Sequence, residues 1–156
     1  MLIRASAIVV GIRAHGEHGA VVRALTAEHG LLAGYVRGGR STRLRPVLQP
    51  GNAVIAEWRA RTDEQLAGMT VELAESRAPA FVDPLTASGI EWTCAFLATV
   101  LPESEPHPAI HLALTGLLDA MTAAPSARGW IAALLAFEAL VERDLGYAAP
   151  ISAVRA

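Results

Sequence analysis

Four arginines within nine residues form the part of this sequence best suited to a chemical role. Residues 37–45 read Arg-Gly-Gly-Arg-Ser-Thr-Arg-Leu-Arg, and no acidic residue stands between Glu28 and Glu57. Guanidinium groups grip phosphate oxygens in bidentate fashion, and glycines give the backbone freedom. Because the net charge of the chain is −2, this basic segment is a local feature. It predicts a loop that binds a polyanion, with nucleic acid as the first candidate and a solvated surface loop as the alternative.

Two further arginines extend this hypothesis to the next extended segment. Arg59 and Arg61 share one face of a strand, opposite its apolar residues. If that face is the exterior, strand and loop would form a basic track for a phosphodiester backbone. Tyr35, one alternate position before Arg37, is either a stacking surface or a core residue. The predicted DNA-binding residues are Arg37, Arg40, Arg43, Arg45, Arg59 and Arg61.

Other reactive side chains predict neither a metal site nor an enzyme. Histidines and carboxylates gather in residues 15–29 and 103–111, but their spacing fits no ligand signature. Cys94, the single cysteine, lies on an apolar helical stripe and is expected to be buried and inert. The sequence has no phosphate-binding GxxxxGK[ST], no GxGxxG after a strand and no GxSxG elbow. We therefore expect no cofactor and no catalytic residues.

The composition predicts a soluble, cytoplasmic protein with two parts of opposite charge. The chain has 156 residues, of which 53% are hydrophobic, enough for one core or two small cores in contact. Up to Arg77 there are ten arginines and seven acidic residues, whereas the remainder has three arginines and eight acidic residues. The start lacks a long apolar region, so a signal peptide is not expected. No uncharged apolar run reaches the roughly 18 residues that a membrane span needs.

The first part reads as short strands separated by turn signals. Val54, Ala56 and Trp58 alternate with more polar neighbours, which is typical of a strand with one buried face. Five short strands in so short a stretch favour a small barrel, because closure removes exposed edges. The expected strands are residues 6–13, 20–26, 31–37, 52–61 and 66–74.

The second part has the period of helices. Asp83 followed by Pro84 predicts a capped start, and apolar residues then recur every three or four positions. A second helix follows Pro108, and a third opens after Ser126 and ends at Gly146. Residues 148–156 show no periodicity. The predicted class is α+β, with a barrel over residues 1–77 and a helical unit over 78–156, joined by a short linker and packed together.

Several segments, in this order, resemble the RecO family of bacterial recombination mediators. They are Thr-Ala-Glu-His-Gly at residues 26–30, Val-Arg-Gly-Gly-Arg-Ser at 36–41 and Leu-Gln-Pro at 48–50. Phe-Glu at 137–138 and Leu-Gly-Tyr at 145–147 continue the likeness. The resemblance covers nearly the whole chain, and none of the segments is a catalytic signature. The family usually continues well past the last segment, often with a cysteine-rich zinc region, so we expect the helical domain here to be incomplete.

The resemblance implies an N-terminal OB-fold that binds single- and double-stranded DNA, followed by a helical domain. Such proteins anneal complementary strands and work with RecR, sometimes RecF, to load RecA onto DNA coated by the single-strand-binding protein, whose acidic C-terminal tail they bind. It also implies that Arg37 and Arg40 contact DNA and that the protein works at the nucleoid. The other arginines are added from charge and spacing.

Two other functions fit the sequence. The acidic, apolar helical half could be the working surface of a protein-interaction adaptor, with the barrel as its support. The barrel could instead bind RNA. Retained partner binding after loss of the loop arginines would favour the adaptor. A strong preference for RNA over DNA would favour the RNA-binding barrel.

Overall fold

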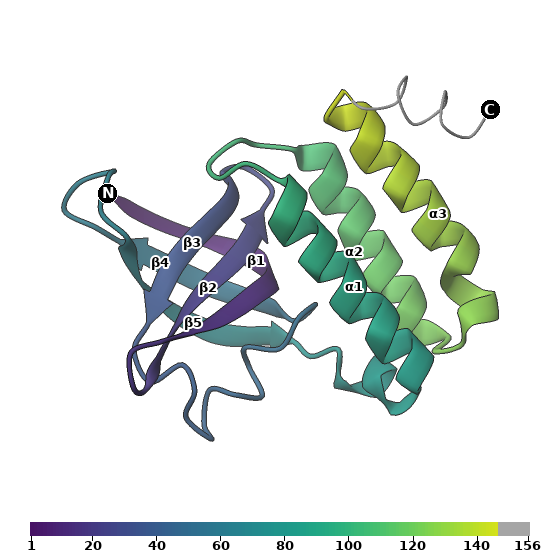
Figure 1. Ribbon diagram of the computed structural model, residues 1–156, viewed down its shortest axis with the longest axis horizontal. Coiled ribbons are helices and arrows are strands. Elements are labelled where there is room, and N and C mark those ends of the chain that lie inside the picture. Colours follow the sequence, from purple (N-terminus) through teal and green to yellow (C-terminus); the bar gives the residue numbers. More distant parts are fainter. Residues whose placement is uncertain (147–156) are drawn as a thin grey trace.

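The computed structural model describes residues 1–146, and it begins with five strands that close into a barrel (Figure 1). The strand order around the barrel is β1-β2-β3-β5-β4, and the parallel pairing of β3 with β5 completes the ring. This is the OB-type barrel that the sequence predicts. The strands are β1 (Leu2–His15), β2 (Gly19–Thr26), β3 (Gly30–Val36), β4 (Ala53–Arg59) and β5 (Ala67–Glu75).

The strand β1 is longer than its apolar pattern indicates, because it serves two partners. Its first half pairs with β4, from Leu2 opposite Arg59, and its second half pairs with β2, as far as His15 opposite Gly19. The register shifts between Val9 and Gly11, which marks a β-bulge. Bulges bend a strand and increase its twist, so a single chain segment can pass from one partner to the other around the barrel.

Large side chains fill the barrel because one strand position has no side chain. Trp58 and Met69 are almost fully buried inside, at 1% and 3% exposure. A Cβ at Gly34 would lie 2.5 Å from Met69 Cβ and 2.9 Å from Trp58 Cδ1. Gly34 therefore leaves the space in which these two side chains pack.

Three helices follow the 3-10 turn of residues Ala78–Val82 and form a unit at one side of the barrel, with the first helix against β1 and the third outermost (Figure 1). They confirm the three periodic segments of the sequence. Gly146 has a φ of 84°, the left-handed conformation that glycine adopts after a helix end. The helices are α1 (Pro84–Val100), α2 (Pro108–Ala123) and α3 (Ala127–Asp144), and the aperiodic segment 148–156 lies outside the described residues.

Asp83 caps α1, as expected from the sequence. Its carboxylate Oδ2 accepts hydrogen bonds from the backbone N–H of Thr86 at 2.9 Å and from the Thr86 hydroxyl at 2.8 Å. Both bonds stabilise the ionised carboxylate, so they lower the pKa of Asp83 below its ordinary value of 3.8, the side-chain bond contributing most. Thr86 in turn accepts from Trp130 Nε1 at 2.9 Å, which connects the cap to α3.

This cap predicts a pH effect at acid pH. A lowered folded-state pKa contributes stability that is present above pH 3.8 and is lost as the pH falls through the folded value. Asparagine caps helices without titrating. We therefore expect wild type to lose stability more steeply than Asp83→Asn as the pH falls below about 4, measured by thermal unfolding followed by circular dichroism. Parallel profiles for the two proteins would contradict the assignment.

A second hydrophobic core joins the barrel to the helices. Ile8, Val10, Leu25 and Leu31 lie on the outer surface of the barrel and are at most 4% exposed, because the helices cover them. Cys94 belongs to the same core. The burial of its side chain raises the pKa of the thiol to about 12, against a smaller lowering by a backbone hydrogen bond with Gly51. At neutral pH this thiol is protonated and unreactive, as the sequence predicts.

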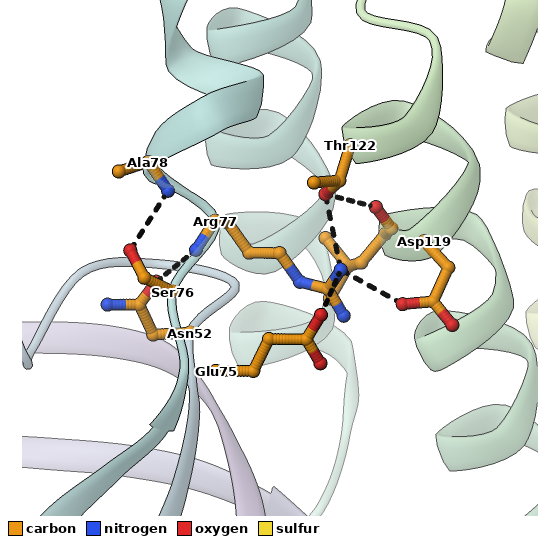
Figure 2. A network of polar contacts seen from close by, with 8 residues as sticks. Asn52, Glu75, Ser76, Arg77, Ala78, Asp119 and Thr122 are labelled. Carbon is orange, nitrogen blue, oxygen red and sulfur yellow. Dashed lines mark hydrogen bonds and ion pairs between the residues drawn. The ribbon is translucent and has the colours of Figure 1, made fainter.

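A buried arginine holds the linker between barrel and helices (Figure 2). The side chain of Arg77 is 3% exposed, and its Nη1 lies 2.9 Å from Asp119 Oδ1 and 3.6 Å from Glu75 Oε1. The same nitrogen donates to the Thr122 hydroxyl at 3.2 Å, and the backbone N–H of Arg77 donates to Asn52 Oδ1 at 2.8 Å. Arg77 thus links three parts of the fold: its side chain joins β5 to α2, and its backbone N–H binds the residue just before β4.

Candidate nucleic-acid interface

The arginine-rich segment between β3 and β4 packs onto the barrel through two leucines. Leu44 and Leu48 are 6% and 4% exposed and pack with the barrel core. Their spacing fits one helical turn, and Leu48 N–H donates to the Leu44 carbonyl at 2.9 Å. The N–H of Arg45 likewise donates to the carbonyl of Ser41 at 2.9 Å. The glycine content of the segment does not reveal these two leucine anchors, which become visible only in the fold.

Arg40 has a structural role in this loop. Its side chain is half-buried, and Nη2 donates to the carbonyl of Gly16 at 2.7 Å and to the carbonyl of Glu17. Its backbone N–H donates to the carbonyl of His18 at 3.2 Å. Arg40 therefore fastens the loop to the turn between β1 and β2.

Three other loop arginines are exposed. In the described part of the chain, no hydrogen bond or ion pair reaches the side chains of Arg37 and Arg43. Arg45 uses one donor, from Nη2 to the carbonyl of Arg40 at 3.1 Å, and stays charged and accessible. The loop sequence supplies no carboxylate to neutralise them. These groups are available to an anionic ligand at a fixed place on the barrel.

Arg59 ends β4 and Arg61 follows it in the connection to β5, and both are exposed. The connection between β4 and β5 lies apart from the loop between β3 and β4 (Figure 1). Arg59 Nε is 2.6 Å from Glu57 Oε1, and Arg4 Nη1 is 3.6 Å from Glu57 Oε2. One carboxylate is therefore shared by two guanidinium groups. The side chain of Arg61 is exposed and has no partner within residues 1–146. The predicted arginines thus form two groups, the loop group and the β4–β5 group.

Strand register connects the β4–β5 group to the end of β1. Arg13 pairs with Val21, Val21 with Tyr35, Tyr35 with Gly68, and Gly68 with Arg59. Directly paired residues share a face, so the two arginines stand in one transverse row on the outside of the barrel. Tyr35 lies in the middle of this row, half-buried on the outer surface. Of its two expected roles, a place in the barrel interior is wrong.

Sequence reasoning missed Arg13 and His15, which extend this surface. The His15 ring meets the Tyr35 ring edge to face, with centroids 5.6 Å apart and an interplanar angle of 72°. Arg13 is exposed and has no side-chain partner among the described residues. Arg13 and His15 are two positions apart, as are Tyr35 and Arg37, and residues with this spacing lie on the same face of a strand. This spacing became informative only once the pairing of β1, β2 and β3 was known.

A groove of about 520 Å³ lies between this surface and the helices. Arg23 lies at its wall, where Nη1 donates to the carbonyl of Ala98 at 2.5 Å and Nε is 3.8 Å from Glu103 Oε1. This arginine therefore connects β2 to the end of α1, and Glu103 partly offsets its charge. The groove is lined by residues that include Gly11, Arg13, Arg23, Ala33, Ala98 and Glu103.

The histidines do not assemble a metal site in the described part. No three histidine, cysteine or acidic side chains within residues 1–146 come together in a group that could hold a metal ion. His107 Nδ1 lies 2.9 Å from Asp144 Oδ2, which joins the start of α2 to the end of α3, and its Nε2 lies 3.5 Å from Glu105. Burial lowers the pKa of His111 below its ordinary value.

No helix within residues 1–146 is long and apolar enough to span a membrane.

Comparison with known proteins agrees with this architecture. Residues 1–77 match the family model described as "Recombination protein O N terminal", and residues 82–153 match "Recombination protein O C terminal". A protein of Phenylobacterium zucineum named DNA repair protein RecO is 45% identical over 147 residues, which cover 94% of this chain and 59% of the relative. Proteins of the same name from Cereibacter sphaeroides and Rhodospirillum centenum are 41% and 47% identical, over 89% and 74% of this chain.

The fold and its exposed arginines define an OB-type barrel protein with a helical unit behind the barrel. The chain belongs to the RecO family of DNA repair proteins. It spans 46% to 59% of the length of these three relatives.

Proposed function

We propose that this chain is a DNA-binding recombination mediator that performs no covalent chemistry. The observation that supports it most is the pair Arg37 and Arg43, which are exposed and have no side-chain partner within residues 1–146, on a loop without acidic residues. Cations in such a position bind the sugar–phosphate backbone with little regard for sequence, and the affinity falls as salt rises. Because the chain belongs to a family of DNA repair proteins, DNA is the first candidate among the polyanions.

Strand annealing follows from the separation of the arginines into two groups. The loop group could hold one backbone while Arg61 and its neighbours hold another, which would reduce the repulsion between two strands. The proposal assigns DNA to the barrel of residues 1–77. It assigns RecR and the tail of the single-strand-binding protein to the helical unit of residues 78–156, so that RecA is loaded indirectly, at the nucleoid in the cytoplasm.

The test is fluorescence anisotropy of a labelled single-stranded oligonucleotide across a salt series. Each lost phosphate contact lowers the slope of log affinity against log salt by about 0.7. For Arg37→Ala/Arg43→Ala we therefore expect a slope lower by about 1.4 and, at 0.1 M salt, an affinity about 25-fold weaker than wild type. Arg40 is left in place because it fastens the loop.

The matched control is Arg128→Ala/Arg143→Ala, which removes the same charge from exposed positions on α3. This control should bind DNA like wild type. Equal losses in both variants would show that only net charge matters, and unchanged binding in both would move the DNA site away from the loop. Binding that does not respond to salt would contradict the proposal as a whole.

A protein-interaction adaptor is the second candidate, favoured by apolar side chains exposed on the helices. The rings of Trp92 and Phe96 stack with centroids 5.2 Å apart and an interplanar angle of 8°, and Trp92 is 49% exposed. Leu112 and Leu135 are 74% and 58% exposed. If the helices alone act, Trp92→Ala would abolish binding of purified RecR while the loop variant leaves it intact.

A further inference from the structure

A second cavity, of about 440 Å³, opens directly behind the arginine loop. It lies between the loop and the linker that leads into α1, and its volume falls in the range of roughly 300–1,000 Å³ typical of small-ligand sites. Figure 2 shows three of its lining residues, Asn52, Ser76 and Ala78, close together beside the Arg77 network. The lining consists of Thr42, Arg45, Pro46, Gln49, Asn52, Ser76, Ala78 and Phe81.

We propose that this cavity receives an unstacked nucleobase of a DNA strand whose phosphate lies on Arg45. The inference rests on the proposed function and assigns the loop a preference for single strands. Bases in a duplex are stacked and paired. A single strand can therefore turn a base into a cavity without the free-energy cost of breaking a base pair.

The chemistry of the lining fits a flat ring with a polar edge. Phe81 and Pro46 present apolar faces against which a base can stack. Gln49 Nε2 donates to the carbonyl of Arg45 at 2.8 Å, and its Oε1 accepts no hydrogen bond within residues 1–146, so this oxygen is available to a ligand. The Thr42 hydroxyl is exposed and can both donate and accept. Such groups can pair with any base edge, so little sequence preference follows.

Asn52 shapes the cavity and is not available to read the base. Its Nδ2 donates to the carbonyls of Pro46 and Val47, at 3.0 and 3.1 Å, and its Oδ1 accepts from the backbone N–H of Arg77. The amide is therefore fully engaged. It fixes the cavity wall to the linker, so the cavity exists before a ligand arrives.

The positive charge of Arg45 would hold a phosphate beside this cavity and so bring the attached base to it. Arg45 lines its mouth and spends one of its five N–H donors within the protein, on the carbonyl of Arg40. The remaining donors can hold a phosphate there. Because Arg37 and Arg43 stand on the same loop, a strand that follows these arginines passes the opening.

The test compares a labelled 12-nucleotide single strand with an abasic strand of equal length and equal phosphate number. Stacking of a base on an aromatic ring strengthens binding. We therefore expect wild type to bind the normal strand about ten-fold more tightly than the abasic strand. The salt dependence should be the same for both strands, since their charges are equal. Two variants alter the cavity: Phe81→Leu removes the ring, and Ala78→Met fills the space from an exposed position.

Both variants should bind the two strands with equal affinity, close to that of wild type for the abasic strand. The control Ala132→Met, at an exposed position on α3, should keep the ten-fold preference. Phe81 also contacts the helical core, so Ala78→Met keeps the test valid if Phe81→Leu unfolds.

Three results would overturn the inference. Wild type might bind both strands equally, with affinity still lost in the loop variant, in which case DNA binding stands without a base site. If wild type prefers the normal strand and both cavity variants keep that preference, the base is held elsewhere. If neither strand binds to wild type, the proposed function fails together with the inference.

Discussion

Replacing Gly30 with alanine is expected to lower the free energy of unfolding by about 3–5 kcal/mol. Gly30 has a φ of 73°, and a Cβ there would stand 2.6 Å from the carbonyl carbon of Glu105 and closer still to its oxygen. These are backbone atoms of the loop between α1 and α2, where Ser104 N–H donates to the carbonyl of Leu31 at 2.9 Å. Neither segment can move aside without breaking this contact.

Gly38→Ala is the matched control for that experiment. Gly38 also has a left-handed φ, of 67°, but a Cβ there would meet no atom of residues 1–146 within 4 Å. We expect it to cost about 1 kcal/mol, the conformational part alone. The difference between the two variants, measured by urea unfolding, isolates the steric contact. Equal losses of stability in the two variants would mean that the start of β3 does not lie against the loop between α1 and α2.

Removing the carboxylate of Asp119 should have the second largest effect. Asp119→Ala leaves the Arg77 guanidinium buried, with Glu75 at 3.6 Å as its nearest remaining acid. Separating a buried charge from its partner is costly, and we expect a loss of about 2–3 kcal/mol in the free energy of unfolding. Glu91→Ala, another exposed carboxylate on a helix, should change stability by less than about 0.5 kcal/mol.

The double variant Arg77→Met/Asp119→Ala tests the cause of that loss. Methionine retains most of the apolar length of the arginine and removes the charge, so no unpaired buried ion remains. We expect the double variant to be more stable than Asp119→Ala alone, by at least about 1 kcal/mol. A double variant that is less stable than either single one would mean that Arg77 acts mainly by hydrogen bonding.

Local signals predicted most of the fold. Alternation located Val54, Ala56 and Trp58 inside the barrel, and all three are buried. The pair Asp83 and Pro84 predicted the start of α1, because the capping interaction is local in sequence. Element ends differ by a few residues, chiefly at β1, where backbone pairing with β4 extends the strand beyond its most apolar stretch.

What depends on contacts between distant segments could not be predicted. The clustering of arginines identified the loop, but it treated Arg40 like its neighbours, although Arg40 is bound to a turn more than 20 residues earlier. Arg13 was missed because its place beside Tyr35 follows from strand pairing. Arg77 gave no signal either, since its partner Asp119 lies on a helix whose position depends on the complete fold.

The core shared by barrel and helices has a consequence for the inheritance of this chain. The family models divide the sequence between residues 77 and 82, yet Ile8, Val10, Leu25 and Leu31 on the barrel pack among helical side chains. A hybrid gene joining the barrel of one homologue to the helices of another would bring together two surfaces with separate histories. We therefore expect substitutions at these four positions to need matching changes on the helices.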